Sequence, residues 1–507
     1  MNSTYNLLSY SKENGGRVLL LFLLFLLAIY EFINAGFNSF AIICLSPALI
    51  LVVYAIFKWR HLAFLTLIIV NYLIPFKLIN WHLPSSLIDE ALELVLLAVA
   101  IIDTRHSPHF ERAANVMFAA LMIWGGLCFI EFFNNTCGLG INFNAWFSGA
   151  RLMVLQLLWI ILVFSIYINS PQILMTYLRL WACLSLFSAF WTWKMIHLGL
   201  STTETSFLYG AGSTTHLLQA GTLIRYWSTF TDAANYGCNA AAASTAFLIL
   251  SITSKFKIDR LFFFITAIAV IWGMFQSGTR TAIFCLMFGI LLFLFLSKSV
   301  RIIIPCTIAF VFFVIILVFT NIGNGNQQIR RMRSAFNKDD ASANVRDINK
   351  AAIAKYMKDA PWGIGIGIHS ENVPAWNKYK KLTNIPPDSE YVYIWVRTGP
   401  IGVAVFAGCM IIMFCGGAYI VLFKLKNRSL IGIGASLCSA FGAIQLAGYA
   451  NQVLYQYPNG LIFYGGLAIV YILPSIESDW IKYEEERLAK EKEKKRLKFE
   501  KKLASRV

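Results

Sequence analysis

Charged side chains are scarce in this chain, and their scarcity excludes most classes of soluble protein. Only 14% of the 507 residues are charged, whereas 58% are hydrophobic, and the mean hydropathy is +0.63. A soluble fold could not bury so much apolar surface, and uncharged runs of at least about 18 residues recur along the chain. The sequence therefore predicts an all-α, polytopic membrane protein.

Three other patterns are missing. The alternating pattern of an outer-membrane barrel is absent, and most apolar runs are plain blocks of Leu, Ile, Phe, Val and Ala, so the spans are expected to be helices. The ten cysteines are scattered without C-x-x-C spacing, which favours packing over a metal site or a disulfide framework. No small-residue cleavage site follows the apolar run after Arg17, so we interpret that run as the first span and not as a cleaved signal peptide.

The basic residues lie where a membrane topology requires them. The net charge of +17 comes largely from short loops and a C-terminal tail, as the positive-inside rule predicts, so it does not indicate nucleic-acid binding. Lys12 and Arg17 before the first span predict a cytoplasmic N-terminus, and the C-terminus is then cytoplasmic as well. About fourteen spans are expected, at residues 18–34, 38–57, 62–79, 88–103, 114–134, 149–169, 172–197, 233–252, 260–276, 281–297, 302–320, 391–422, 429–448 and 459–475.

The spans divide the chain into four parts. Residues 1–320 are expected to hold eleven spans, residues 321–390 a large non-cytoplasmic loop, residues 391–476 three more spans, and residues 477–507 a basic cytoplasmic tail. Lys and Glu alternate in the tail at helical spacing, which predicts a solvated helix near anionic headgroups or a plain solubilising tail. The only other sizeable loop on the non-cytoplasmic face covers residues 198–232.

The large loop is far longer than an ordinary connection and is expected to carry its own helix. The pattern predicts a helix near 343–360, with Ser342 as the N-cap and Pro361 as the stop. An apolar stripe is predicted at helical spacing, and Arg346 lies at its border in a row with Ile353 and Met357. The predicted stripe consists of Val345, Ile348, Ala352 and Tyr356.

Four ionisable residues fall near the non-cytoplasmic interface on this topology: Arg225, Arg280, Arg346 and Asp388. A guanidinium at the mouth of an apolar run is costly in lipid, so it usually marks function or a partner. Arg binds phosphate bidentately and stays charged when partly desolvated, which suits a phosphate-bearing ligand whose apolar part remains in the bilayer. Plainer interpretations exist for each, because an interfacial Arg can be a snorkelling anchor and an Asp after Pro-Pro can be a turn residue.

Other candidates carry weaker signals. The glycines of "GIGIG" either allow close backbone packing or present consecutive N–H groups to an anion, and these include Gly365 and Gly367. His216 and His369 are possible acid–base groups. No Asp-x-Asp triplet occurs on the outer face, so no metal and no cofactor are expected.

Four segments in order resemble the O-antigen polymerase/ligase superfamily of bacterial envelope glycosyltransferases. They are "RYWSTFTDAANYGCNAAAA", "SGTRTAIFCLMFGILLFL", "VRDINKAAIAKYMKDAPWGIGIG" and "DSEYVYIWVRTGPIG", and together they cover roughly residues 220–405. Each motif is loose by itself, but their order is moderately specific. The positions that match the superfamily's patterns include Arg225, Phe230, Asn235, Arg280, Arg346, Tyr391, Gly399 and Gly402.

The resemblance implies a multi-pass enzyme of the bacterial inner membrane with its active site facing the periplasm. Such an enzyme moves a glycan from a polyprenyl-diphosphate donor to an acceptor hydroxyl. Arg225 and Arg280, assisted by Arg346, would neutralise the departing diphosphate, and Asp388 would accept the hydroxyl proton in an inverting displacement. The supporting residues would be Asn235, Gly365, Gly367 and Tyr391.

Asp388 stands where the superfamily's ligases have His, which leaves Glu390 and His369 as alternative bases. The loss of that His favours a polymerase, whose acceptor is another lipid-linked glycan, over a ligase, whose acceptor is lipid A-core; a protein O-glycosylating enzyme is a third version. The expected partners are the donor, the acceptor and membrane lipids. The alternative from another class is a lipid-glycan flippase, although transporters tend to show internal repeats and charged helices at mid-membrane.

Overall fold

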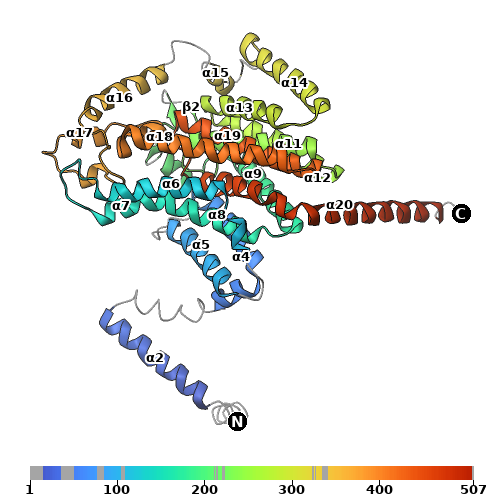
Figure 1. Ribbon diagram of the computed structural model, residues 1–507, viewed down its shortest axis with the longest axis horizontal. Coiled ribbons are helices and arrows are strands. Elements are labelled where there is room, and N and C mark those ends of the chain that lie inside the picture. Colours follow the sequence, from blue (N-terminus) through green and yellow to red (C-terminus); the bar gives the residue numbers. More distant parts are fainter. Residues whose placement is uncertain are drawn as a thin grey trace. The chain divides into compact units, whose positions relative to one another are not determined.

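The computed structural model describes residues 15–35, 51–76, 85–103, 109–210, 212, 215–219, 223–322, 325, 327–333 and 341–504. The chain divides into two compact units, Met1–Ala63 and Phe64–Val507. The first unit contains α2 (Gly15–Ala35), a short helix, Leu51–Lys58, and the first turn of α4 (Arg60–Leu73), whose remaining residues belong to the second unit. Figure 1 labels the elements along the chain.

The second unit is built almost entirely of helices. Its first half contains α5 (Ser85–Ile102), η2 (Phe110–Arg112), α6 (Val116–Ile130), η3 (Glu131–Phe133), α7 (Phe143–Ala150), η4 (Arg151–Leu155), α8 (Gln156–Tyr167), α9 (Pro171–His197), α10 (Thr202–Tyr209), an antiparallel pair of strands β1 (Leu218–Gln219) and β2 (Leu223–Ile224), α11 (Ala233–Thr253) and α12 (Lys257–Gln276). Its second half contains α13 (Arg280–Leu296), α14 (Val300–Phe319), α15 (Gln327–Arg333), α16 (Ala341–Met357), η7 (Ser370–Asn372), α17 (Lys380–Thr383), α18 (Glu390–Tyr419), η8 (Ile420–Lys424), α19 (Arg428–Ala450), η9 (Gly460–Tyr464) and α20 (Gly465–Ala504).

The long apolar runs fold as helices because a helix satisfies its own backbone hydrogen bonds in lipid. Eight helical segments of the described chain are long and apolar enough to cross a membrane, or nine if the bent pair at residues 51–73 is one span. The fold is therefore that of an all-α polytopic membrane protein, as predicted. The count of about fourteen stays a prediction, and much of the expected span at 38–57 lies outside the described residues. Helices also form at the expected spans 18–34, 88–103, 281–297 and 302–320.

Small side chains let the central helices approach one another closely. Helix α11, whose sequence is rich in Ala, Gly and Ser, packs against α12, α13 and α19. A Cβ added to Gly237 would lie 2.4 Å from Ser277 Oγ, so the first turns of α11 press directly on the turn between α12 and α13. This contact places the start of α13, where Arg280 lies, beside the start of α11.

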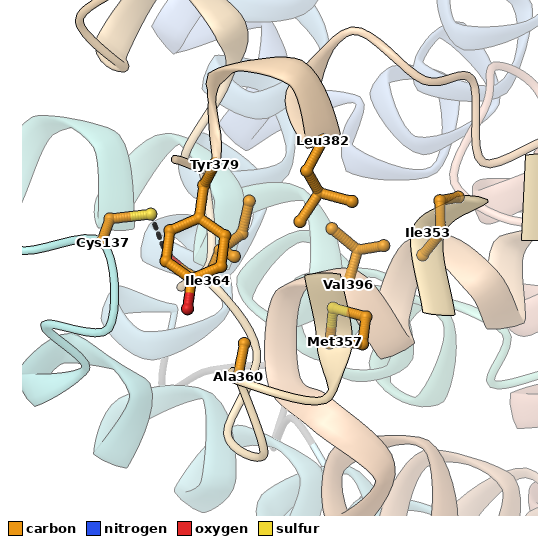
Figure 2. Close-up of a cluster of buried hydrophobic side chains, with 8 residues drawn as sticks. All are labelled: Cys137, Ile353, Met357, Ala360, Ile364, Tyr379, Leu382 and Val396. Atoms are coloured by element: carbon orange, nitrogen blue, oxygen red, sulfur yellow. Dashed lines mark hydrogen bonds between the residues drawn. The ribbon is translucent and has the colours of Figure 1, made fainter. Parts of the chain in front are cut away.

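The segment between α14 and α18 has a hydrophobic core of its own (Figure 2). Ile353 and Met357 of α16 pack there with residues of the following loop, of α17 and of α18, and with Cys137 of the loop after η3. The core fixes this segment on α18. Its buried members are Cys137, Ile353, Met357, Ala360, Ile364, Tyr379, Leu382 and Val396.

Helix α16 differs from the predicted helix in its position and in its buried face. It spans Ala341–Met357, so Ser342 lies inside the helix and is not its N-cap. The predicted apolar stripe is wrong, because Val345 and Ile348 are 54% and 67% exposed. The buried row is instead the one that contains Ile353 and Met357, and the partly buried Arg346 lies on the same row.

The glycine-rich loop that contains Gly365 binds α18 where that helix is broken. The backbone leaves the helical conformation at Gly399, and Pro400 has no N–H to donate to the carbonyl of Val396. The N–H of Ile364 donates to that carbonyl at 2.8 Å, and the N–H of Gly365 donates to the carbonyl of Arg397 at 3.0 Å. The break therefore holds the loop through two backbone hydrogen bonds.

The predicted last span and the start of the tail form one continuous helix, α20 (Gly465–Ala504). Trp480 donates from Nε1 to Ser429 Oγ at 2.9 Å, and Glu484 accepts from Lys255 Nζ at 3.2 Å. Both residues are buried. The first turns of the tail are thus packed against other helices, and the prediction of a solvated helix is wrong for them.

Candidate functional site

Arg225 is fixed by the turn between α12 and α13. It follows strand β2, and its side chain is buried, with only 8% of its surface exposed. Its Nε donates to the Ser277 carbonyl at 3.2 Å and its Nη2 donates to Thr279 Oγ1 at 3.0 Å, while Nη1 lies 3.5 Å from the His216 carbonyl. Three partners in three directions hold the planar guanidinium in one orientation.

Two further guanidiniums act on Arg225. Arg280 is the first residue of α13 and Arg346 lies on α16, and both are partly buried. Burial lowers the pKa of Arg225, Asp232 opposes this change, and the positive charges of Arg280 and Arg346 lower the pKa of Arg225 further. The charges of Arg280 and Arg346 therefore act on Arg225, although the three residues lie far apart in the sequence. Like charges repel, so this arrangement favours an anionic partner.

Arg346 and Asp388 line one cavity of about 510 Å³. Its walls come from α16, from the residues that precede α18, and from the ends of α18 and α19. Asn349, one turn after Arg346 on α16, donates from Nδ2 to Asp388 Oδ2 at 2.8 Å. Arg346 and Lys350 thus bring two cations to the cavity, and Asp347 and Asp388 bring two carboxylates. Asn349 orients one of these carboxylates, that of Asp388.

Strained backbone marks the loops around these residues. Among the described non-glycine residues, three have positive φ: His216 (54°), Ser228 (55°) and Asp388 (56°). All three lie in the loops that carry or contact Arg225 and the cavity. Such conformations cost about 1–3 kcal/mol each and gather at functional sites. Asp tolerates this region better than most residues, because its short polar side chain can hydrogen-bond locally.

The end of α19 ties the cavity to the start of α13. Ser389 donates from Oγ to the Gly448 carbonyl at 3.2 Å, which joins the start of α18 to the end of α19. Asn451, just past α19, donates from Nδ2 to Thr281 Oγ1 at 3.0 Å. Because Thr281 follows Arg280 directly, the Arg280 backbone is held beside the residues that close the cavity.

An apolar groove of about 350 Å³ adjoins the cavity. It runs between α13, α18 and α19 and is lined mainly by aliphatic and aromatic side chains, such as Phe288, Leu292 and Phe414. The groove and the cavity share two lining residues, Tyr391 and Tyr449. A ligand with a long apolar part and a charged end could therefore occupy both at once.

Part of the chain is similar to a known protein family. Residues 262–407 match the family described as O-antigen ligase. Over these residues the chain is similar to that family, which supports the resemblance to the O-antigen ligase/polymerase superfamily. The search of curated proteins found no match. The matched segment runs from α12 to the middle of α18, so it contains Arg280, Arg346 and Asp388, whereas Arg225 lies before it.

The superfamily resemblance left three candidate bases, and they occupy different places. Of the three, only Asp388 lines the cavity with Arg346. Glu390 is buried, and its Oε2 accepts from the backbone N–H of Leu454 at 3.1 Å. His369 lies 3.4 Å from a nitrogen of Arg397, and burial together with the charge of Arg397 lowers the pKa of His369.

The glycines proposed as supporting residues have packing roles. The N–H of Gly365 is occupied by the Arg397 carbonyl, so it is not directed at a ligand. Gly367 has a φ of 75°, and an added Cβ would lie 1.7 Å from the Ala145 carbonyl oxygen of α7. Neither glycine lines the cavity around Asp388. Of the two interpretations that the sequence left open, close backbone packing describes them.

Asn235 belongs to a buried chain of amides. Its Nδ2 donates to the Tyr457 carbonyl at 2.9 Å and to Thr231 Oγ1 at 3.2 Å, and its Oδ1 accepts from Asn459 at 2.7 Å. Asn459 in turn accepts from Asn239 at 2.8 Å. The chain fastens the loop between α19 and η9 to α11, so Asn235 supports the site through the backbone and not through a ligand.

Sequence reasoning missed several residues of the cavity. Lys350 lies four positions after Arg346 on the predicted helix, so helical spacing could have placed the two cations on one face. Asn349 hydrogen-bonds Asp388, which lies 39 positions later in the sequence, and no local sequence pattern predicts that contact. Tyr449 closes the cavity from the end of a long apolar helix, where its sequence context is that of an ordinary span.

Proposed function

We propose that this chain transfers a glycan from a polyprenyl-diphosphate donor to an acceptor hydroxyl, at a site that faces the periplasm. The main support is the junction of the cavity with the groove at Tyr391 and Tyr449. A polyprenyl chain suits the apolar groove, and its diphosphate would then lie in the adjoining cavity, which Arg346 and Lys350 line. On this topology the enzyme lies in the bacterial inner membrane with both termini in the cytoplasm.

The proposed mechanism assigns each charged group one role. Arg225, Arg280 and Arg346 stabilise the negative charge that develops on the departing diphosphate. Arg225 does so without reorganisation, because its hydrogen bonds fix it beforehand. Asp388 accepts the proton of the acceptor hydroxyl as that oxygen attacks the anomeric carbon from the face opposite the leaving group. The new glycosidic bond forms as the bond to the diphosphate breaks, which inverts the configuration. Asn349 orients Asp388 for this step.

The acceptor that we favour is a second lipid-linked glycan, which makes the enzyme a polymerase. The superfamily's ligases have His at the position of Asp388, and this chain departs from them there. Product analysis in a deletion strain separates the two activities. A polymerase deletion removes the ladder of chain lengths, whereas a ligase deletion leaves a full-length polymer on its carrier lipid.

The central test is transfer from lipid-linked donor by the full-length protein in nanodiscs. Arg280→Ala should reduce transfer at least about 100-fold without lowering the yield of folded protein, because one preorganised charge-stabilising group is typically worth that much. Asp388→Asn should cost about 10²–10⁴-fold, which is the usual contribution of general acid–base catalysis.

Asp347 provides the matched control for the base. It lines the same cavity from α16, so it is the rival carboxylate. Asp347→Asn should cost less than about tenfold, because Asp388 alone carries the orienting hydrogen bond from Asn349. Equal losses in the Asp347 and Asp388 variants would remove Asp388 from the mechanism. Normal product from Arg280→Ala would remove the diphosphate assignment.

A further inference from the structure

A second cavity, larger than the first, lies beside Arg225. It has a volume of about 690 Å³ and is bounded by the residues just after α4, by the end of α9, by α10 and the loop that follows it, and by the segment that follows strand β2. Five of its fourteen lining residues are aromatic, including Trp191 and Trp227, and seven carry hydroxyl groups. The mechanism proposed above uses none of these side chains.

The indole of Trp191 is held in place before any ligand arrives. Its Nε1 donates to Glu204 Oε1 at 2.8 Å, and its ring lies edge-on to Phe76 with 4.6 Å between centroids. Lys194 Nζ lies 5.0 Å from the Trp191 ring and 2.6 Å from Glu204 Oε2. Ser201 caps α10 and donates its backbone N–H to the same carboxylate. One buried carboxylate therefore fixes the helix start, the lysine and the ring.

The lining residues match the surface of a sugar ring. A pyranose has faces of C–H groups and a rim of hydroxyls, and an aromatic face attracts the partly positive hydrogens of C–H groups. Hydroxyl side chains both donate and accept, so they complement a rim of sugar hydroxyls. Among the described residues, no hydrogen bond occupies the hydroxyls of Thr202 or Ser206, which are both exposed at this cavity.

Other ligand classes fit the cavity less well. An acyl or prenyl chain would cover the hydroxyl groups of Thr202 and Ser206 without offering them partners, which costs free energy for each. A phosphate would meet a carboxylate, because Glu204 is the one charged side chain among the described residues that line the cavity. A neutral polyhydroxylated ligand has neither problem.

The cavity is joined to the site of transfer. Trp227 stands two residues after Arg225, and Thr231, which also lines the cavity, donates to Gln456 at 3.1 Å and accepts from Asn235 at 3.2 Å. A sugar bound against Trp227 would thus lie close to the arginines that hold the diphosphate.

We propose that this cavity is a carbohydrate subsite, in which the fixed face of Trp191 and the surrounding hydroxyls bind a neutral sugar ring of one of the two glycan substrates. The proposal rests on the proposed function, since it takes the glycan from there. It adds a place of binding that is separate from the diphosphate site and independent of lipid.

The test uses a probe without lipid or phosphate: the reducing oligosaccharide released from the lipid-linked donor by mild acid. Its dissociation constant for the full-length protein in nanodiscs is measured by saturation-transfer difference NMR. Trp191→Leu keeps apolar bulk but removes the flat face, and it should weaken binding at least tenfold. Trp193→Leu is the control, because Trp193 lies on the same helix, is 42% exposed and does not line the cavity.

A second pair of variants avoids the packed core. Ser206→Met places a bulky apolar side chain in the cavity from an exposed position on α10, whereas Thr205→Met changes an adjacent exposed residue that does not line it. We expect weaker oligosaccharide binding for the Ser206 variant alone. Equal binding by the Ser206 and Thr205 variants would overturn the proposal, as would unchanged binding by a folded Trp191→Leu protein.

Failure of this subsite and failure of the proposed function can be told apart. Farnesyl diphosphate, which carries no sugar, should bind Trp191→Leu normally and bind Arg280→Ala weakly, whereas the oligosaccharide should show the reverse. In the transfer assay, Ser206→Met should raise KM for one substrate by at least tenfold. A rise for the donor assigns the subsite to the donor glycan, a rise for the acceptor assigns it to the acceptor glycan, and no rise for either would refute it.

Discussion

The hydrogen bond between Asn349 and Asp388 offers the sharpest test of the catalytic assignment. Asn349→Ala removes a donor that lies 2.8 Å from Asp388 Oδ2 and leaves the carboxylate in place. A hydrogen bond to a charged group is worth about 1.5–3 kcal/mol. Asp388 is partly exposed, and water will replace some of that energy, so we take about 1.4 kcal/mol. That value corresponds to a tenfold lower kcat.

The loss should appear in kcat and not in KM, because Asn349 orients a catalytic group and is not assigned to substrate binding. Asn344→Ala is the matched control, since Asn344 is an exposed residue of the same type on α16. Initial rates of transfer are measured over a range of donor concentrations at fixed acceptor.

A double-mutant cycle separates orientation of Asp388 from a general structural role. If Asn349 acts through Asp388, then Asn349→Ala should have no further effect in an Asp388→Asn background. A second tenfold loss in that background would refute the reasoning. A single variant with kcat within twofold of the original protein would do so as well.

Two other predictions concern stability. Gly363→Ala should lower the free energy of unfolding by about 2–4 kcal/mol, because a Cβ at φ 76° would lie 2.3 Å from the Arg397 carbonyl carbon. Gly138→Ala is the control, because Gly138 has a φ of 64° but lies in open space, and this variant should lose only about 1 kcal/mol. Equal melting temperatures for the two variants would contradict the contact of Gly363 with α18. Burial alone would raise the pKa of Glu204, but hydrogen bonds, the strongest from Lys194, outweigh it and the pKa is lowered. The stability that Glu204 contributes is therefore present above its unfolded-state pKa of about 4.3 and is lost as pH falls through the lower folded-state pKa. Glu204→Gln should lower the melting temperature at pH 7. It should also make the melting temperature depend less on pH below about pH 4. If the melting temperature of the variant depends on pH as that of the original protein does, the ion pair does not contribute to stability.

Local patterns in the sequence predicted the helical fold, whereas the roles of the arginines stay a prediction. Long apolar runs leave the backbone no alternative to a helix in lipid, so their positions follow from composition alone. Arg225 and Arg280 each stand at the edge of such a run, where a charge is costly. Their proximity in space was expected from a shared side of the membrane, and the electrostatic effect of Arg280 and Arg346 on Arg225 is consistent with that expectation.

Contacts between distant segments could not be predicted in the same way. The sequence presents Pro400 as a helix interruption, but it does not say that Ile364 will donate to the carbonyl that Pro400 leaves without a partner. Helical spacing on α16 gave an apolar stripe, yet tertiary packing buried the neighbouring row with Ile353 and exposed Val345. The cavity at Trp191 also depends on tertiary contacts, because its walls come from five separate segments of the chain.

The buried amides around Asn235 have a direction. Each one gives its hydrogens to the next, from Asn239 to Asn459, then to Asn235 and on through Thr231 to Gln456. Backbone carbonyls fix this direction, because Asn459 Nδ2 also donates to the Val453 carbonyl at 2.8 Å and Asn235 Nδ2 to the Tyr457 carbonyl at 2.9 Å. Turning either amide over would set its oxygen against a carbonyl oxygen. A single Asn→Asp exchange would remove a donor and interrupt the row at that step. The loop after α19 is thus held by the direction of these hydrogen bonds as well as by packing. Replacing one of these Asn residues by Asp should therefore be poorly tolerated.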